Sequence, residues 1–361
     1  MKYKLGILIG LFITFCTLIN TDTYAASSDK KSGDFVYYVN NGEVEILSYS
    51  GNAKNLVIPD KIKGKKVTVI QSGAIKNNKY IKTIKLGRYI KTIYGDDEGF
   101  FPNCKNIKKV TVHSKNKYFF SKNGVLFNKK EKKGIALQYY PQGQKGAYTI
   151  PNNVKVIYGG AFINCTKLTS VTIPKSVLKV GPNPFRGCNK LCQIKVAKAN
   201  SKYKSVGGVL LNKKGTTLVS FPNAKSSKYT IPKNVKKIEG YAFSKNKKLT
   251  SITLPKKVTK IESEAFSNCT KLKSITIEGK VSIYNQFKNC PKLEKVIVKN
   301  KKADFIVNYN DDCYGCALGI FYIEKHDLDA YQSKNVRLYA PEGSLAEAFA
   351  LKNNISFKKM D

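Results

Sequence analysis

One 23-residue pattern recurs along this chain and restricts what the chain can fold into. Residues 168–190 read LTSVTIPKSVLKVGPNPFRGCNK, and residues 249–271 read LTSITLPKKVTKIESEAFSNCTK. The shared frame is L-x-x-I-x-I-P-x-x-V-x-x-I-x-x-x-A-F-x-x-C-x-K. A unit this short cannot enclose a core alone, so it must bury its apolar positions against its neighbours. The pattern predicts a solenoid, which presents a surface rather than a catalytic pocket.

The residue before the proline of the frame marks each repeat. About ten coils follow one another without a linker, marked by Ile58, Leu86, Val112, Ile150, Ile173, Val196, Ile231, Leu254, Ile277 and Val298. Each L-x-x-I-x-I segment alternates inward and outward positions, as a short half-buried strand does. We therefore expect one parallel sheet with about 4.8 Å between coils. The V-x-x-I segment should form a second extended wall, and A-F-x-x-C should turn the chain back.

Two coils are longer than the others, and both ends of the array carry different sequence. Residues 124–141 and 207–222 are apolar runs joined by a lysine-rich turn, which predicts two enlarged coils, each with a β-hairpin projecting from the stack. Residues 35–47 alternate around Asn41-Gly42, a strong hairpin signal.

Residues 336–357 predict a last strand followed by a helix. Ser344 should cap the helix, and Glu347 three residues later completes a capping box. These signals predict an N-terminal hairpin cap over residues 26–54, a β-rich leucine-rich-repeat solenoid over 55–300, and a C-terminal strand-helix cap over 301–361.

The first 25 residues have the composition of a secretory signal peptide. Lys2 and Lys4 precede the apolar run Leu5–Leu18, and small residues follow at Ala25-Ala26. We place the cleavage after Ala25. The alternative, a retained anchor helix, is disfavoured because the apolar run is shorter than the ~20 residues that a membrane span needs. The mature chain is therefore expected to be secreted, without a transmembrane segment, and to associate non-covalently with a cell surface or cell wall.

Nine cysteines in an exported chain would ordinarily indicate disulfides. Here most of them occupy one repeat position, three residues after the Phe of A-F-x-x-C, and asparagine takes that position in two coils. A position that accepts either residue requires a compact group that bonds to backbone at a turn. We predict a buried structural ladder of free thiols and amides, formed by Asn78, Cys104, Cys165, Cys188, Asn246, Cys269 and Cys290.

These features together resemble a known family. The signal peptide, the front hairpin leading into L-V-I-P, the A-F-x-x-C repeats, the N-G-V-L-F-N-K hairpin coils and the closing A-P-E-G-S-x-A-E-x-x-A motif are similar to BspA-like (Treponema-type) leucine-rich repeat surface proteins. The resemblance covers nearly the whole mature chain. It implies a bacterial surface or secreted protein that adheres to host matrix proteins. Gly87, Ala197, Glu278 and Lys299 depart from the family's proline.

The formal net charge is +40, and lysines recur at fixed repeat positions. Six residues before the marker lie Lys167, Lys190, Lys225, Lys248, Lys271 and Lys292; two residues after it lie Lys175, Lys198, Lys233 and Lys256. Between these rows, on the outward strand face, lie Thr172, Lys195, Thr230, Thr253 and Thr276. Stacked coils would space the charges ~5 Å apart, within a Debye length of ~8 Å, so an extended anion would relieve their repulsion. Alternatively, the rows are solvated margins.

Other candidate sites are weaker. Cys313 and Cys316 form a C-x-x-C, interpreted as a local disulfide or two free thiols, since a structural zinc site needs four ligands. The acidic run 96–98 lacks the alternation of a calcium loop and is interpreted as an exposed turn. His113 and His326 lie in different coils, with no nucleophile motif beside either. We therefore expect no enzyme activity, metal or cofactor.

The sequence predicts a monomeric secreted or cell-surface adhesion protein that binds through its repeat face. The expected partner is an extracellular matrix or other host protein, or an anionic polymer such as teichoic acid or an acidic glycan. Nucleic acid is disfavoured, because aromatic residues are not interleaved on that face. The alternative is a structural cell-wall-associated protein that charge retains without a host ligand.

Overall fold

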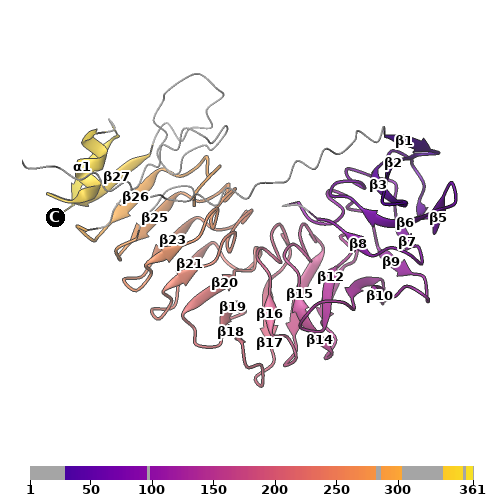
Figure 1. Ribbon diagram of the computed structural model, residues 1–361. Helices are drawn as coiled ribbons and strands as arrows, with labels where there is room; N and C mark the ends of the chain where they lie inside the picture. The colour runs from indigo at the N-terminus through magenta and orange to yellow at the C-terminus, as the bar shows by residue number, and fades with distance from the viewer. Residues whose placement is uncertain (1–28, 96–97, 282–285, 303–335, 353–354, 361) are drawn as a thin grey trace, which may run out of the picture.

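The computed structural model describes residues 29–95, 98–281, 286–302, 336–352 and 355–360. The predicted signal peptide, the C-x-x-C and His326 lie outside these residues. The described chain is a β-solenoid, as predicted, and α1 (Leu345–Lys352) is the single helix in it. The coils form an arc whose two ends, at β1 (Lys30–Ser32) and α1, lie on the same side of the bend (Figure 1).

One wall of the solenoid is built from the predicted L-x-x-I-x-I strands. They form three parallel sheets: β4 (Asn55–Val57), β7 (Thr83–Leu86) and β9 (Lys109–Val112); β13 (Gly146–Thr149), β15 (Leu168–Ile173) and β17 (Gln193–Val196); and β21 (Lys228–Thr230), β23 (Ser251–Leu254), β25 (Ser274–Ile277), β26 (Lys295–Val298), β27 (Arg337–Pro341) and β28 (Phe357–Met360). Inward side chains of these strands are buried, which agrees with the alternation read from the sequence.

The second wall also consists of three sheets. They contain β1, β2 (Phe35–Asn40), β3 (Glu43–Tyr49), β5 (Lys61–Ile62), β6 (Lys65–Ile70) and β8 (Thr92–Ile93); β10 (Phe119–Lys122), β11 (Val125–Asn128), β12 (Ile135–Tyr139), β14 (Val154–Ile157) and β16 (Lys179–Val180); and β18 (Tyr203–Val206), β19 (Val209–Asn212), β20 (Thr217–Ser220), β22 (Lys237–Ile238) and β24 (Lys260–Ile261). Each sheet begins with antiparallel strands and continues with parallel V-x-x-I strands.

The expectation of one continuous parallel sheet is wrong, because the sheet is divided at both hairpin coils. Val110 N in β9 donates to the carbonyl of Gly124 at 2.8 Å and does not pair with strand β13. After β17, the carbonyl of Gly208 accepts from Ile194 N at 2.8 Å. The hairpin backbone therefore occupies the strand edge that the next coil would have paired with, and the stack is divided into three blocks.

The predicted hairpins exist, but they do not project from the stack. Strands β11 and β12 pair with each other and then with β14, so the hairpin is part of the second wall. Leu126, Phe127 and Leu137 are at most 1% exposed, because they pack into the core. The predicted N-terminal hairpin β2–β3 occupies the same place in the first block: β1 pairs with β2 as β10 does with β11, and β3 pairs with β6 as β12 does with β14.

The A-F-x-x-C turns share a left-handed backbone position immediately before the ladder residue. Its φ lies between 54° and 75° at Asn77, Asn103, Asn164, Gly187, Lys245, Asn268 and Asn289. Asparagine and glycine tolerate this conformation best, which explains the choice of residue in six of these seven coils. Lys245 is the exception, and its side chain has a separate role described below.

Most ladder residues join successive turns through hydrogen bonds to backbone; the exception is Asn246, whose buried Nδ2 has no hydrogen-bond partner. The buried thiol of Cys188 donates to Phe162 O at 3.0 Å, Cys269 to Phe243 O at 3.3 Å and Cys290 to Phe266 O at 3.2 Å. Asn78 Nδ2 donates to Gly51 O at 2.8 Å, which is the same kind of bond from an amide. Cys104, Cys165, Cys188, Cys269 and Cys290 are buried and not cross-linked. The position satisfies carbonyls that water cannot reach.

The aromatic residue of each turn stacks on that of the preceding turn. Phe221, Phe243, Phe266 and Phe287 form one column with ring centroids 4.7–4.8 Å apart, and Tyr140, Phe162 and Phe185 form a second column at 5.0–5.1 Å. The spacing matches the ~4.8 Å between strands, so register in the walls and stacking in the core support each other.

The C-terminal cap follows the prediction, with one difference. Ser344 Oγ accepts from Glu347 N at 3.1 Å, as an N-cap residue should. Glu347 Oε2 accepts from Gly343 N at 2.6 Å, one residue before the Ser344 N–H that a capping box would use. Strands β27 and β28 extend the third sheet beyond β26, and α1 packs against them, so the end of the core is covered.

Burial raises the pKa of the Cys104, Cys165 and Cys269 thiols. We expect iodoacetamide at pH 8 to alkylate the exposed Cys192 at least tenfold faster than the ladder cysteines, since the thiolate is the reactive form. Peptide mass spectrometry over time measures each site. In guanidinium chloride the difference should vanish. Equal rates in the native protein would contradict the buried ladder.

Replacing Phe243 by Ala removes the ring that links Phe221 to Phe266. The expected loss in the free energy of unfolding is about 3–5 kcal/mol, since a fully buried ring leaves a cavity. Urea unfolding measures it. Leu178→Ala, at a position that is 38% exposed, is the control and should change the free energy by less than about 0.5 kcal/mol.

Candidate functional site

The outward side of the parallel sheets, together with the residues flanking each strand, is called the sheet face here. It brings several of the predicted site residues into register. Thr172 pairs with Lys195, whereas Thr230, Thr253 and Thr276 lie on three successive strands. Lys195 and Thr230 belong to different sheets, so the predicted central row is interrupted at the second hairpin coil.

The lysines six residues before the marker form the leading row: Lys167, Lys190, Lys225, Lys248, Lys271 and Lys292. All are exposed except Lys225, which is partly buried. The leading row continues across the junction between the second and third blocks. There, Ala224 N donates to Leu191 O at 2.9 Å and joins the two coils. Lys248 Nζ donates to Ala224 O at 3.1 Å. The trailing row of Lys175, Lys198, Lys233 and Lys256 is fully exposed.

The sheet face carries positive charge without acidic residues over most of its length. Its seven consecutive coil segments contain sixteen Lys or Arg and no Asp or Glu: residues 80–88, 106–114, 144–152, 167–175, 190–198, 225–233 and 248–256. In the described residues, acidic side chains occur on this face only toward its ends, at Asp60, Glu278, Glu294 and Glu342. The lysines between them have no carboxylate on the face to neutralise them.

Acidic side chains are instead placed on the second wall, where they pair with lysines. Lys91 Nζ lies 2.7 Å from Glu43 Oε1, and Glu262 Oε1 lies 2.9 Å from both Lys237 Nζ and Lys260 Nζ. These ammonium groups lower the pKa of Glu43 and of Glu262. In the described part of the chain, the ion pairs on the sheet face lie at its C-terminal end, where Lys299 pairs with Glu278 and Lys359 with Glu342. The two walls therefore differ in charge.

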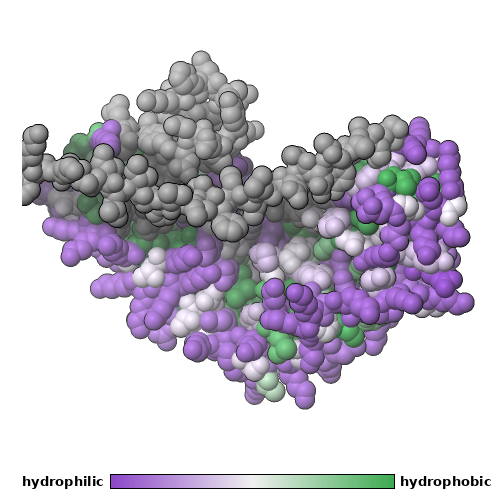
Figure 2. Space-filling view, in the orientation of Figure 1, coloured by the Kyte–Doolittle hydropathy of each residue, from purple (hydrophilic) through white to green (hydrophobic). Residues whose placement is uncertain are grey.

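This segregation was missed at the level of sequence, although a signal existed. The motif V-x-x-I-E places Glu239 and Glu262 directly after the second-wall strands β22 and β24. Sorting the acidic residues by repeat position, as was done for the lysines, would have shown that they avoid the strand segments of the sheet face. Figure 2 shows that hydrophilic residues cover most of the described surface in one view.

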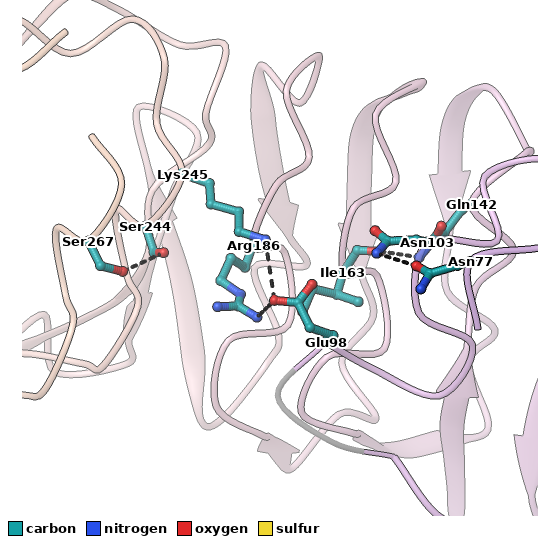
Figure 3. A network of polar contacts seen from close by, with 9 residues as sticks. All are labelled: Asn77, Glu98, Asn103, Gln142, Ile163, Arg186, Ser244, Lys245 and Ser267. Atoms are coloured by element: carbon teal, nitrogen blue, oxygen red, sulfur yellow. Dashed lines mark hydrogen bonds and ion pairs between the residues drawn. The ribbon is translucent and has the colours of Figure 1, made fainter. Parts of the chain in front are cut away.

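A polar cluster on the turn side links all three blocks. Glu98 Oε1 lies 3.1 Å from Arg186 Nη2 and 3.5 Å from Lys245 Nζ, and the Arg186 guanidinium stacks on Tyr241 at 5.1 Å (Figure 3). Burial and then the neighbouring Arg186 lower the pKa of Lys245. Glu98 lies in a turn with its side chain 44% exposed, as predicted for residues 96–98, and its carboxylate also pairs with two cations, which the sequence did not predict. Asp96 and Asp97 lie outside the described residues.

The cluster accounts for the choice of lysine at position 245, where the other turns have asparagine or glycine in the same left-handed conformation. In a straight stack, Glu98 and Lys245 would be several strand spacings of ~4.8 Å apart. Their contact requires the turns to lie on the inside of the arc seen in Figure 1. A lysine in the left-handed position reaches Glu98, which the usual asparagine is too short to do. Strained residues of this kind persist where surrounding contacts hold them.

In the described ranges, no group of three or more His, Cys, Asp or Glu side chains lies close enough to hold a metal ion. Cys192 is a free, exposed thiol outside the ladder. Among the residues with described structure, no helix has the length and hydrophobicity to cross a membrane.

A sequence model of the BspA-type leucine-rich repeat region matches the chain in six copies, over residues 18–129, 142–208 and 218–326. The chain belongs to this family. The match covers most of the coils of the BspA-type solenoid and is interrupted within both hairpin coils, at residues 130–141 and 209–217. The comparison with curated protein sequences found no significant match.

Solved structures with a similar fold are bacterial leucine-rich repeat proteins. One from Eubacterium ventriosum is 23% identical, with 76% of this chain and 78% of that chain covered and a TM-score of 0.44. A leucine-rich cell surface protein from Faecalibacterium prausnitzii is 19% identical, with coverage of 76% and 89% and a TM-score of 0.39. The pneumococcal vaccine antigen PcpA is 15% identical, with coverage of 93% and 99% and a TM-score of 0.39.

Replacing Glu98 by Gln in this BspA-type chain tests whether the cluster stabilises the arc. The expected loss in the free energy of unfolding is about 1–3 kcal/mol, the contribution of hydrogen bonds to charged groups. The double variant with Arg186→Met should cost less than the two single changes added, by about 0.5–3 kcal/mol, because the residues interact. Urea unfolding measures all three. Glu264→Gln, on another turn and outside the cluster, is the control. Simple additivity would exclude the coupling.

Proposed function

We propose that this protein is exported, acts at or near the cell surface as a non-enzymatic binding protein, and engages an anionic polymer or an acidic surface of an extracellular protein through its sheet face. Membership of the BspA-type family supports a surface-associated interaction scaffold. The observation that carries the proposal is the sheet face of residues 80–256, which is lysine-rich and free of Asp and Glu in every strand segment.

The spacing of the lysines makes the face suited to an extended anion. Adjacent strands hold like charges roughly 5 Å apart, well inside the Debye length of ~8 Å at physiological salt. Their repulsion costs free energy in the unbound protein. A chain of phosphate, sulfate or carboxylate groups that runs along the solenoid axis would remove this repulsion at every coil, so its affinity should grow with its length.

The side chains between the rows suit a hydroxyl-bearing polymer. Outward positions of β15 and β23 are Ser170 with Thr172 and Ser251 with Thr253, which offer both donors and acceptors. Aromatic rings are absent from the outward positions of β13, β15, β17, β21, β23 and β25, so the stacking surface used for single-stranded nucleic acid is not present on these described strands. Teichoic acid and acidic glycans fit this chemistry better.

Reversing the charge of Lys225, Lys248 and Lys271 together tests the proposal. Binding to immobilised heparin-like glycan or teichoic acid should be abolished, because the leading row then carries three negative charges. For the unaltered protein, affinity should fall steeply between 50 and 300 mM NaCl, since charge contacts are screened. Surface plasmon resonance measures both effects, and a matrix protein presented in parallel tests the protein partner.

The matched control reverses Lys130, Lys132 and Lys133, three exposed lysines on the hairpin turn of the second wall. This variant has the same net charge as the first, so it separates the sheet face from overall charge. Full binding by the sheet-face variant would remove the lysine rows from the proposal, and equal loss in both variants would reduce the effect to net charge.

A further inference from the structure

The junction between the first two blocks contains a cavity in the second wall. Strand β8 ends the first sheet of this wall, and β10–β12 begin the next sheet without pairing with β8. The space between them measures about 300 Å³. Its lining includes Thr92, Phe100, Phe119, Asn128, Gln138 and Tyr158.

The corresponding place at the second junction is crossed by a tyrosine. Tyr203 occupies the position of Phe119, since Tyr203 pairs with Asn212 as Phe119 does with Asn128. The Tyr203 hydroxyl accepts a hydrogen bond from Val180 N at 2.9 Å and so bridges β18 to β16. Phe119 has no hydroxyl and makes no such bridge.

A second difference between the junctions concerns polarity. Gln138 lies between Leu137 and Tyr139 in the first hairpin, and Val219 holds the same place in the second hairpin. Gln138 Nε2 donates to Ile93 O at 3.3 Å, and Gln138 Oε1 accepts from Asn128 Nδ2 at 3.3 Å. Each of these amide atoms can make a further hydrogen bond. The first junction is therefore open and lined with amides, whereas the second has a valine and a bridging tyrosine.

The rest of the lining combines aromatic rings with a neutralised cation. Phe100 and Tyr158 are partly buried, with ring centroids 6.4 Å apart and planes tilted by 46°. Lys91 lies at the cavity, but both oxygens of Glu43 accept from its Nζ, at 2.7 and 2.9 Å. Lys91 is thus paired, and the Tyr158 hydroxyl donates to Glu131 Oε2 at 2.7 Å.

We propose that this junction cavity binds one pyranose unit of an uncharged saccharide. A sugar ring has an apolar C–H face that packs on aromatic rings and hydroxyl groups at its edge that bond to amides such as Asn128 and Gln138. These amide atoms already bond within the protein, and a sugar hydroxyl, unlike a purely apolar ligand, can use their remaining hydrogen-bond capacity. The volume lies at the lower end of the ~300–1,000 Å³ typical of small-molecule sites, which suits a single sugar unit.

Binding of methyl glycosides tests this site directly. The probes are methyl glucoside, methyl galactoside and methyl N-acetylglucosaminide, titrated into the full mature chain and followed by saturation-transfer difference NMR. At least one should bind with a Kd on the order of 1 mM, as the size of the ligand allows. Binding should be the same at 50 and 500 mM NaCl, because no net charge is involved. The sheet face is salt-dependent, so failure of one proposal does not affect the other.

Two variants locate the site. Gln138→Val copies the second junction, and Phe100→Ala removes a partly exposed ring at the edge of the first core cluster. Each should weaken binding at least tenfold. Val219→Ala is the matched control in the second hairpin and should leave binding unchanged. Urea midpoints show whether each variant folds. If Gln138→Val does not fold, the binding measured with Phe100→Ala decides the test.

Three results would overturn the proposal. The first is that no glycoside binds. The second is that binding survives in the folded Gln138→Val and Phe100→Ala variants, since the sugar would then sit elsewhere. The third is that N-acetyltyrosinamide binds more tightly than every glycoside and is displaced by none, which would assign the cavity to an aromatic side chain of a protein partner.

Discussion

Register between successive coils is the constraint on which the other features depend. Parallel hydrogen bonds pair residues 23 positions apart in regular coils, as for Thr172 with Lys195 and Thr253 with Thr276. Because the sequence repeats at the same period, like side chains lie directly beside one another. Phenylalanines form a stacked column, thiols form a ladder and lysines form rows. The first two arrangements stabilise the stack, whereas the third costs repulsion unless an anion binds.

The ladder shows how a solenoid satisfies backbone groups at its turns. A carbonyl at each turn faces the next coil in the buried interior, where an unpaired group would be costly. A thiol or an amide of the following coil donates to it, as Cys290 does to Phe266 O and Asn78 does to Gly51 O. Cysteine is thus used as a small buried donor, which explains why the described coils contain so many cysteines without disulfides.

The two hairpin junctions carry the contacts that do not follow the repeat. Each hairpin takes over a strand edge and ends a sheet on both walls. Departures from the repeat accompany these junctions: Glu98 spans the blocks to reach Arg186 and Lys245, and the first junction keeps a cavity where Tyr203 bridges the second. Specific recognition in such a protein is expected at junctions, while the regular coils supply a continuous electrostatic surface.

The repeat by itself determined the solenoid, the two walls, the caps and the lysine rows, because period and alternation are local properties of the sequence. The buried Asn116 and Asn200, whose amides bond to carbonyls of the preceding coil, were also within reach of sequence, since N-x-x-[FY] occurs in both hairpin coils. Only the tertiary structure decided the division into three blocks, the Glu98 cluster and the cavity. These depend on which strand edges the hairpins occupy and on the curvature of the stack, and both are set by contacts between residues far apart in the chain.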